Sequence, residues 1–283
     1  MPCIARYQSV GAHCMRPLAG EPPALPGGTP SDVLHRSLSQ EEAVRQKGKE
    51  GYVSLQSSSM NEQPKTVEAS KKEVLHPEES ITTLLLIRHG HTRMTEEGRL
   101  YSDPEAELTD EGLKQSKALA EWLMSRPPDV VLSSTAKRVV ATAESISGQT
   151  NIPILRVEDL NEWHVGNWEG RTYLDLKKNS PDEYKAWTAD PIRMRPPGGE
   201  SIEDMYERTK SRIAEIIEQY DGKRVALVTH AGIVRSVLVH ALGMPLDNFW
   251  RISIPVGTVS KVDFSKSFAT VHFMAMRPGA DEV

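Results

Sequence analysis

Four side chains of this 283-residue chain have the types and the placement that a phosphate site requires. Arg88 and His89 follow an apolar, strand-like run, His230 follows a second such run, and Arg138 comes soon after a third. A guanidinium group offers a planar fork of donors that matches two phosphate oxygens. A neutral imidazole nitrogen can attack phosphorus and hold it covalently. These residues therefore indicate phosphoryl chemistry, although a single histidine at a strand end is more often only a hydrogen-bonded residue.

Phosphoryl transfer to a histidine needs further donors and an acid. Backbone N–H groups at a helix start bind phosphate, and the small residue Ala231 lies where the predicted helix 232–242 begins. The leaving alkoxide needs a proton from a positioned acid. Glu162 and Glu169 both lie in the loop-rich segment 158–200, so both are candidates for that acid.

The elements that would position these residues alternate along the chain. Strands are expected at 81–87, 129–132, 152–157 and 225–229, and a closing hairpin at 256–264 and 268–274. Helices are expected after the N-cap Thr109, over 136–147, after the capping box of Ser201 and Asp204, and over 232–242. The alternation predicts an α/β fold, a three-layer α/β/α sandwich with a mainly parallel sheet. Ligands bind at the carboxyl ends of such strands, which would bring the candidate residues to one edge.

Six motifs in this order resemble the histidine phosphatase superfamily, also called the phosphoglycerate mutase-like family. The resemblance extends from Leu84 to about Phe264. The matching motifs are Arg88–Thr92, Leu108–Gly112, Arg138 with Thr142 and Ala143, Leu160–Gly170, Pro196–Ser201 and Thr229–Gly232. The resemblance implies a phosphoglycerate mutase-like fold.

The resemblance also implies a role for each candidate residue. His89 would become phosphorylated, and Arg88, Arg138 and His230 would bind the phosphoryl oxygens. Glu162 would donate the proton, because it occupies the acid position of the family motif.

The resemblance extends to further substrate-binding positions, with some departures. Thr92 and Thr95 would contact the substrate, as would Ala231. Thr95 stands where the family often has asparagine, and His91 stands where glutamate or glutamine is common. These departures concern the choice of substrate rather than the core chemistry.

Several functions compete on these residues. A phosphomonoester hydrolase acting on a small phosphorylated metabolite is favoured, and α-ribazole phosphate is one substrate that relatives handle. A phosphoglycerate mutase is less favoured, because the sequence has Glu162-Trp163-His164-Val165-Gly166 where family mutases have Glu-Arg-His-Tyr-Gly. A non-catalytic phosphate-binding module is least favoured, since binding alone would not need both a nucleophile and an acid.

A zinc site is the alternative to this phosphoryl chemistry. His89, His91, His164 and His230 offer enough imidazoles for zinc. The neighbouring arginines would repel a cation, and no carboxylate or cysteine cluster completes a ligand set. We therefore expect neither a metal nor another cofactor.

Composition narrows the class of protein. The net charge is −5, with 38% hydrophobic and 26% charged residues, so no nucleic-acid partner is expected. The apolar run 84–87 is too short to span a membrane. Only two cysteines occur, both near the N-terminus, and no secretory signal is evident, which favours the cytoplasm. A homodimer is compatible with the sequence.

The composition also divides the chain. Residues 1–79 are rich in proline, glycine and polar residues, and we expect them to be a disordered extension. Met60 is an alternative start, in which case the residues before it would not be native. Residues 80–283 would form the histidine phosphatase domain.

Phosphatase activity should not depend on a divalent metal, because arginines rather than carboxylates surround the proposed phosphate. Treatment with a chelator should leave the hydrolysis of nitrophenyl phosphate unchanged. Loss of activity with recovery on adding zinc or magnesium would support the histidine–metal alternative instead.

Overall fold

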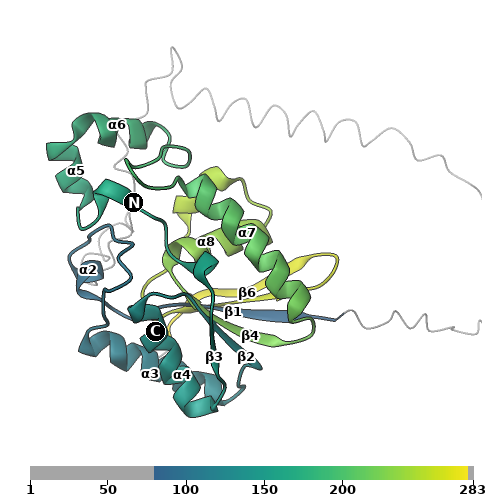
Figure 1. Ribbon diagram of the computed structural model, residues 1–283. Coiled ribbons are helices and arrows are strands. Elements are labelled where there is room, and N and C mark those ends of the chain that lie inside the picture. The colour runs from purple at the N-terminus through teal and green to yellow at the C-terminus, as the bar shows by residue number, and fades with distance from the viewer. Residues whose placement is uncertain (1–79, 280–283) are drawn as a thin grey trace, which may run out of the picture. The chain divides into compact units, whose positions relative to one another are not determined.

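The computed structural model describes residues 80–279, shown as the coloured ribbon in Figure 1. The expected N-terminal extension, residues 1–79, lies outside the described residues and stays a prediction. Within the described residues, six strands form one sheet with helices on both of its faces.

The sheet has the strand order β3-β2-β4-β1-β5-β6. Four strands run parallel: β1 (Thr82–Arg88), β2 (Val130–Ser133), β3 (Ile154–Arg156) and β4 (Arg224–Thr229). The last two, β5 (Val259–Phe264) and β6 (Ala269–Met276), form the expected hairpin, and β5 pairs antiparallel with β1. The prediction of a mainly parallel sheet is therefore confirmed.

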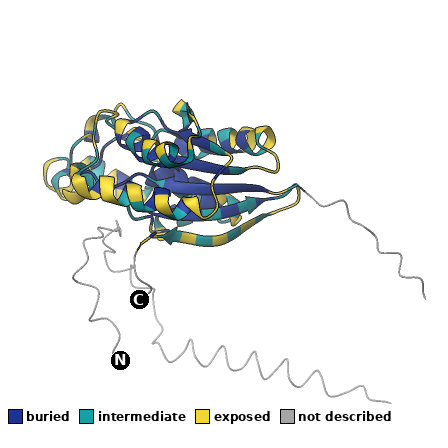
Figure 2. Ribbon diagram, turned by 90° about the horizontal axis from the view of Figure 1, so that it is seen from below, coloured by how far each residue is buried: buried dark blue, intermediate teal, exposed yellow. Residues whose placement is uncertain are grey.

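Alternate residues of the central strand β1 enter two different cores, because successive strand side chains point to opposite faces. Leu84 and Leu86 belong to the core on one face, which α7 (Ile202–Gln219) and α8 (Ala231–Ala241) cover. Leu85 and Ile87 belong to the other core, beneath α3 (Asp110–Met124) and α4 (Lys137–Thr150). All four side chains are fully buried, and Figure 2 shows the dark, buried strands between helices with exposed outer faces. The three-layer arrangement is confirmed.

Two predicted helix starts are present with the expected caps. The Thr109 hydroxyl accepts a hydrogen bond from the N–H of Gly112 at 3.2 Å, at the start of α3. At the start of α7, the Ser201 hydroxyl accepts from the N–H of Asp204 at 3.1 Å, and the Asp204 carboxylate accepts from the N–H of Ser201 at 2.8 Å. These bonds satisfy backbone donors that a helix start leaves free.

The expectation of a loop-rich stretch at 158–200 is only partly right. It holds the short turns η1 (Glu158–Leu160) and η2 (Gly166–Trp168), and the helices α5 (Tyr173–Asn179) and α6 (Pro181–Ala189). Pro181 is the first residue of α6. An N–H group at this position has no hydrogen-bond partner within the helix, so proline, which lacks the N–H, is tolerated there. The remaining short elements are α2 (Arg93–Glu96) and η3 (Leu246–Arg251).

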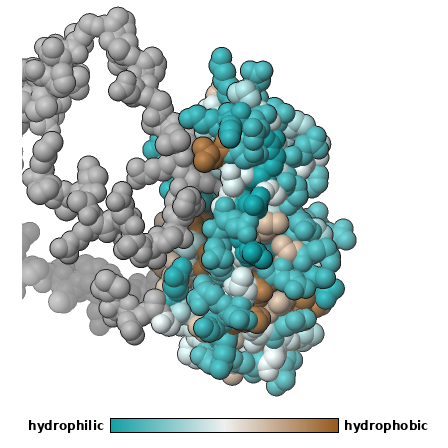
Figure 3. Space-filling view, turned by 90° about the vertical axis from the view of Figure 1, so that its left-hand side faces the viewer, coloured by the Kyte–Doolittle hydropathy of each residue, from teal (hydrophilic) through white to brown (hydrophobic). Residues whose placement is uncertain are grey.

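The helices of residues 80–279 differ from what a membrane span requires. Among residues 80–279, every helix is too short or too polar to cross a bilayer. On the face that Figure 3 shows, hydrophilic side chains cover most of the visible described surface, and hydrophobic ones form only small patches.

The turn after β1 lies directly against the start of α3. A Cβ atom on Gly112 would overlap the carbonyl oxygen of His91, and one on Gly90 would overlap the carbonyl oxygen of Gly112. The N–H of Thr109 also donates to the His91 carbonyl at 3.0 Å. Two glycines therefore allow the close backbone approach that holds the segment around His89.

Replacing Gly112 by alanine should lower the free energy of unfolding by about 1–3 kcal/mol, because backbone atoms would have to move apart. Gly148 is a matched control: it also lies inside a helix, α4, but a Cβ there meets no atom within 4 Å. Gly148→Ala should raise the free energy of unfolding by up to about 1 kcal/mol through helix propensity. Urea unfolding of both variants checks this, and equal effects would contradict it.

Candidate active site

The ends of β1 and β4 bring two histidines together. Arg88 and Thr229 are register partners in these parallel strands, and His89 and His230 are the next residues along the chain. The backbone N–H of His89 donates to the Thr229 carbonyl at 3.0 Å. The two imidazole ring centroids lie 5.3 Å apart. Both rings can therefore reach one phosphate group, as the strand-end argument predicts.

His89 is held in one tautomer. Its side chain is almost completely buried, and Nδ1 lies 2.7 Å from the Gly90 carbonyl oxygen. A carbonyl can only accept, so Nδ1 carries the proton and Nε2 keeps the lone pair. Burial, together with the positive charges of Arg138 and Arg88, holds the pKa of His89 well below its ordinary value. The ring is therefore neutral and has a free nucleophilic nitrogen at ordinary pH.

His230 is held in the opposite tautomer. Arg138 Nη2 lies 3.2 Å from Nδ1 and can only donate, so Nδ1 accepts. Nε2 then carries the proton and donates to the Ser134 hydroxyl at 2.8 Å. Burial and the positive charge of Arg138 lower the pKa of His230 well below its ordinary value. Ser134 follows β2, so three neighbouring strands contribute to this one group.

The two arginines form a cationic site in which neither is ion-paired to a carboxylate among the described residues, although the negative charge of Glu162 acts on both. Arg138, from α4, is only 1% exposed; its Nη1 donates to the Asp103 carbonyl at 2.6 Å, and its guanidinium lies 4.5 Å from the Tyr101 ring centroid. Arg88 Nη1 donates to the Ile254 carbonyl at 2.5 Å. The Nε atoms of both arginines are buried without a hydrogen-bond partner within residues 80–279. Buried, unpaired cationic donors favour binding of an anion.

Glu162 lies at the start of α8, beside His230. Its carboxylate accepts from the backbone N–H of Gly232 at 3.2 and 3.3 Å and from the N–H of Trp163 at 3.0 Å. A Cβ atom on Gly232 would overlap Oε1 of Glu162. The absence of a side chain at 232 is therefore what lets the carboxyl group approach the histidine pair.

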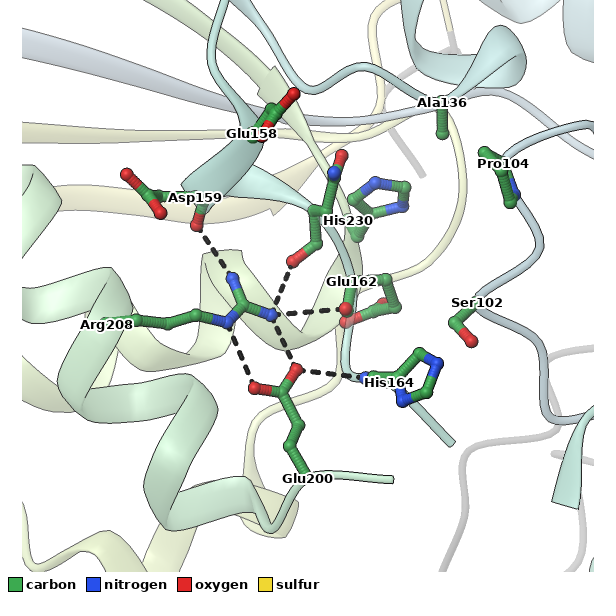
Figure 4. A pocket seen from close by; sticks show the side chains of 11 residues that line it. Ser102, Pro104, Ala136, Glu158, Asp159, Glu162, His164, Glu200, Arg208 and His230 are labelled. Atoms are coloured by element: carbon green, nitrogen blue, oxygen red, sulfur yellow. Dashed lines mark hydrogen bonds and ion pairs between the residues drawn. The ribbon is translucent and has the colours of Figure 1, made fainter. Parts of the chain in front are cut away.

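The acid segment, residues 158–164, is fastened to the ends of two strands. Asn161 Oδ1 accepts from the N–H of Thr135 at 3.0 Å, just after β2. The Leu160 carbonyl accepts from the Thr229 hydroxyl at 2.7 Å, at the end of β4. A pocket of about 310 Å³ opens beside Glu162 and His230 (Figure 4).

The other predicted substrate contacts lie next to this site. Ala231 is the first residue of α8, so its N–H has no partner within the helix. Thr92 caps α2, and its hydroxyl lies 3.0 Å from the Tyr101 hydroxyl, whose ring packs on Arg138. The Thr95 hydroxyl donates to the Thr92 carbonyl at 2.6 Å. Contacts of Thr92 and Thr95 with a substrate stay predictions.

The structure also shows the surroundings of three further residues from the sequence analysis. The carboxylate of Glu169, the alternative acid, accepts from the N–H and hydroxyl of Ser102 at 2.8 and 2.7 Å and is exposed to solvent. His91 Nδ1 lies 2.8 Å from the hydroxyl of Thr109, at the start of α3. His164 lines the pocket and is exposed. Within residues 80–279, no group of three or more histidine, cysteine, aspartate or glutamate side chains could hold a metal ion.

Several residues of the site were not predicted. The sequence gives only a weak indication of Ser134, which is one of two serines that follow the expected strand at 129–132. Gly232 lies in the Thr229–Gly232 motif, but the motif does not predict that the Glu162 carboxyl group packs against this glycine. Tyr101 and Arg208 had no signal, because their contacts are with residues distant in sequence: Arg138 for Tyr101, and residues 159–162 for Arg208.

The arrangement matches a known family. The model of the histidine phosphatase superfamily (branch 1) matches residues 84–276. The chain belongs to this superfamily. The predicted phosphatase class and phosphoglycerate mutase-like fold are confirmed, since similar proteins of this superfamily are named as phosphatases.

Relatives of this histidine phosphatase cover most of its domain. An adenosylcobalamin/alpha-ribazole phosphatase from Escherichia coli (strain K12) is 29% identical over 194 residues, which are 69% of this chain and 96% of the relative. A metal-independent phosphoserine phosphatase from Arabidopsis thaliana is 34% identical over 163 residues, 56% of this chain and 68% of the relative. The crystal structure of the alpha-ribazole phosphatase from Shigella flexneri superposes with a TM-score of 0.65 at 29% identity, covering 71% of this chain and all of that one.

Stability should fall as the pH drops below 6.5, the ordinary histidine pKa. In that range the unfolded chain protonates His89 and His230, whereas the folded protein, with both pKa values lowered, does not. The unfolded state then binds more protons, so the free energy of unfolding decreases by up to about 1.4 kcal/mol per pH unit for each histidine.

Urea unfolding between pH 7.5 and 5 measures this slope. A variant carrying both His89→Gln and His230→Gln should have a flatter profile in the same range. An equally steep profile in wild type and variant would contradict the assignment of the slope to these two histidines.

Proposed function

We propose that this chain hydrolyses phosphate monoesters of small metabolites through a phosphohistidine at His89. One observation carries the proposal: the neutral imidazole of His89, with a free Nε2, lies 5.3 Å from the His230 ring and is exposed to the positive charges of Arg138 and Arg88, whose Nε atoms are buried without a partner among the described residues. A phosphate monoester brings the negative charge that the arginines lack and the phosphorus atom that the imidazole can attack.

The first step forms a bond between His89 Nε2 and phosphorus. Arg88 and Arg138 hold the phosphoryl oxygens, with the N–H of Ala231 as a further donor at the start of α8. His230 joins them by donating its Nε2 proton to a phosphoryl oxygen in place of the Ser134 hydroxyl. The bond between phosphorus and the ester oxygen breaks, and Glu162 transfers its proton to the departing alkoxide. The alcohol leaves, and the phosphoryl group stays on His89.

The second step uses water and restores the enzyme. Glu162, now a carboxylate, takes a proton from a water molecule as the water oxygen attacks phosphorus. The P–N bond breaks, inorganic phosphate leaves, and His89 recovers its lone pair. The same carboxyl group therefore acts first as acid and then as base.

The substrate class is supported by the relatives. They are named as phosphatases for adenosylcobalamin/alpha-ribazole, glucosyl-3-phosphoglycerate and phosphoserine, which are three different small metabolites. One relative is named as metal-independent, in agreement with the expected metal-free chemistry. A cytoplasmic location stays a prediction from the sequence.

His89→Ala should abolish the covalent intermediate and nearly all turnover. Glu162→Gln should still react with nitrophenyl phosphate, whose leaving group needs little protonation, but should lose about 10²–10⁴-fold in rate on alkyl phosphates. Acid-quench labelling with radioactive phosphate, combined with kcat/KM for both ester types, measures both effects.

Glu169→Gln is the matched control, because Glu169 is the alternative acid in the same motif. It should keep the wild-type ratio of alkyl to nitrophenyl activity. If the His89 variant still labels at histidine, the nucleophile is misassigned. If Glu169→Gln rather than Glu162→Gln selectively slows alkyl esters, the acid is misassigned.

A further inference from the structure

One arginine outside the phosphate site binds three backbone carbonyls of the acid segment. Arg208, on α7, donates from Nη1 to the Asp159 carbonyl at 2.7 Å. Its Nη2 donates to the Asn161 carbonyl at 2.8 Å and to the carbonyl of Glu162 itself at 3.2 Å. Figure 4 shows the guanidinium group of Arg208 at the centre of these hydrogen bonds.

Glu200 holds the same guanidinium from the other side. Its Oε1 lies 2.7 Å from Arg208 Nη2, and its Oε2 lies 3.1 Å from Nε. Oε1 also accepts from the backbone N–H of His164 at 3.0 Å. The ion pair therefore fixes backbone groups on both sides of Glu162, at 161–162 and at 164.

The bonding pattern requires a guanidinium group. Three carbonyl oxygens and a carboxylate lie around one side chain, and arginine alone offers five donors in a fixed plane. Both members of the pair are partly shielded, with side chains 26% and 20% exposed for Arg208 and Glu200. This shielding makes the bonds stronger than those of a fully exposed ion pair.

We propose that Arg208 is a positioning residue for the acid: it sets the backbone at Glu162 so that the carboxyl group meets the leaving oxygen of the substrate. The inference rests on the proposed role of Glu162. Arg208 does not act on the substrate itself, and its effect is transmitted through the acid segment.

This role has a kinetic signature that general stabilisation lacks. A displaced acid slows only those reactions that need a proton on the leaving group, and shifts of about 1 Å can reduce such rates by about 10²-fold. A fall in the amount of folded enzyme slows all substrates equally. The ratio of kcat/KM for an alkyl phosphate to that for nitrophenyl phosphate, measured on one sample, therefore isolates the position of the acid.

Arg208→Gln should lower this ratio by about 10–10²-fold, because an amide cannot replace the bonds to three carbonyls. Arg212→Gln is the matched control, one turn further along the same helix. Arg212 also contacts the acid segment, but only through the Asp159 side chain: it pairs with the carboxylates of Asp159 and Glu215 and binds no backbone group at 159–162. Its variant should keep the wild-type ratio within about twofold.

Two further variants make the test independent of folding losses. Arg208→Lys keeps the charge but not the planar fork, so it should also lower the ratio. In the double variant Arg208→Gln/Glu162→Gln, the ratio should equal that of Glu162→Gln alone, because the position of an absent acid has no effect. A wild-type ratio in both Arg208 variants, or a further fall in the double variant, would overturn the inference.

The Glu162→Gln variant separates this inference from the proposed function. If Glu162→Gln leaves the ratio unchanged, Glu162 is not the acid and the proposed mechanism fails. If Glu162→Gln lowers the ratio while Arg208→Gln does not, the mechanism stands and only the positioning role of Arg208 is wrong.

Discussion

The site depends on two guanidinium groups that form no ion pair with a carboxylate in the described part of the chain. A buried cation is costly unless something compensates it. Each arginine donates to a carbonyl oxygen, and Arg138 also donates to His230 Nδ1 and lies over the Tyr101 ring, yet the Nε atom of each has no partner among residues 80–279. Burial, together with the same positive charge, keeps both imidazoles neutral. The charge of Arg88 and Arg138 therefore favours binding of an anion and adds to the effect of burial that leaves His89 with a nucleophilic nitrogen.

The fold supplies this arrangement through adjacent parallel strands. β1 and β4 end side by side, so His89 and His230 come into contact without any sequence proximity. The start of α8 then adds backbone donors next to the two rings, and one of them binds Glu162. Hydrogen bonds from the ends of β2 and β4, together with Arg208, hold the acid segment against this edge.

Hydrogen-bond partners and packing residues on several elements decide the geometry of the site. The tautomer of His89 follows from a carbonyl one residue away, whereas that of His230 follows from Arg138 and Ser134, on other elements. Trp163 and Trp168 lie in the acid motif, yet they are 5% and 0% exposed and pack against each other with ring centroids 6.3 Å apart. They support the acid segment from the core.

The sequence by itself determined the order of the six strands and of the helices α3, α4, α7 and α8, the motifs, and the strand ends at which His89 and His230 would be found. These follow from local periodicity and from the rule that parallel strands expose their carboxyl ends along one edge. Only the tertiary structure decided that Arg208 binds the acid segment and that Gly232 makes room for Glu162. Such contacts join residues up to 70 positions apart, and local sequence pattern carries no information about distances between separate elements.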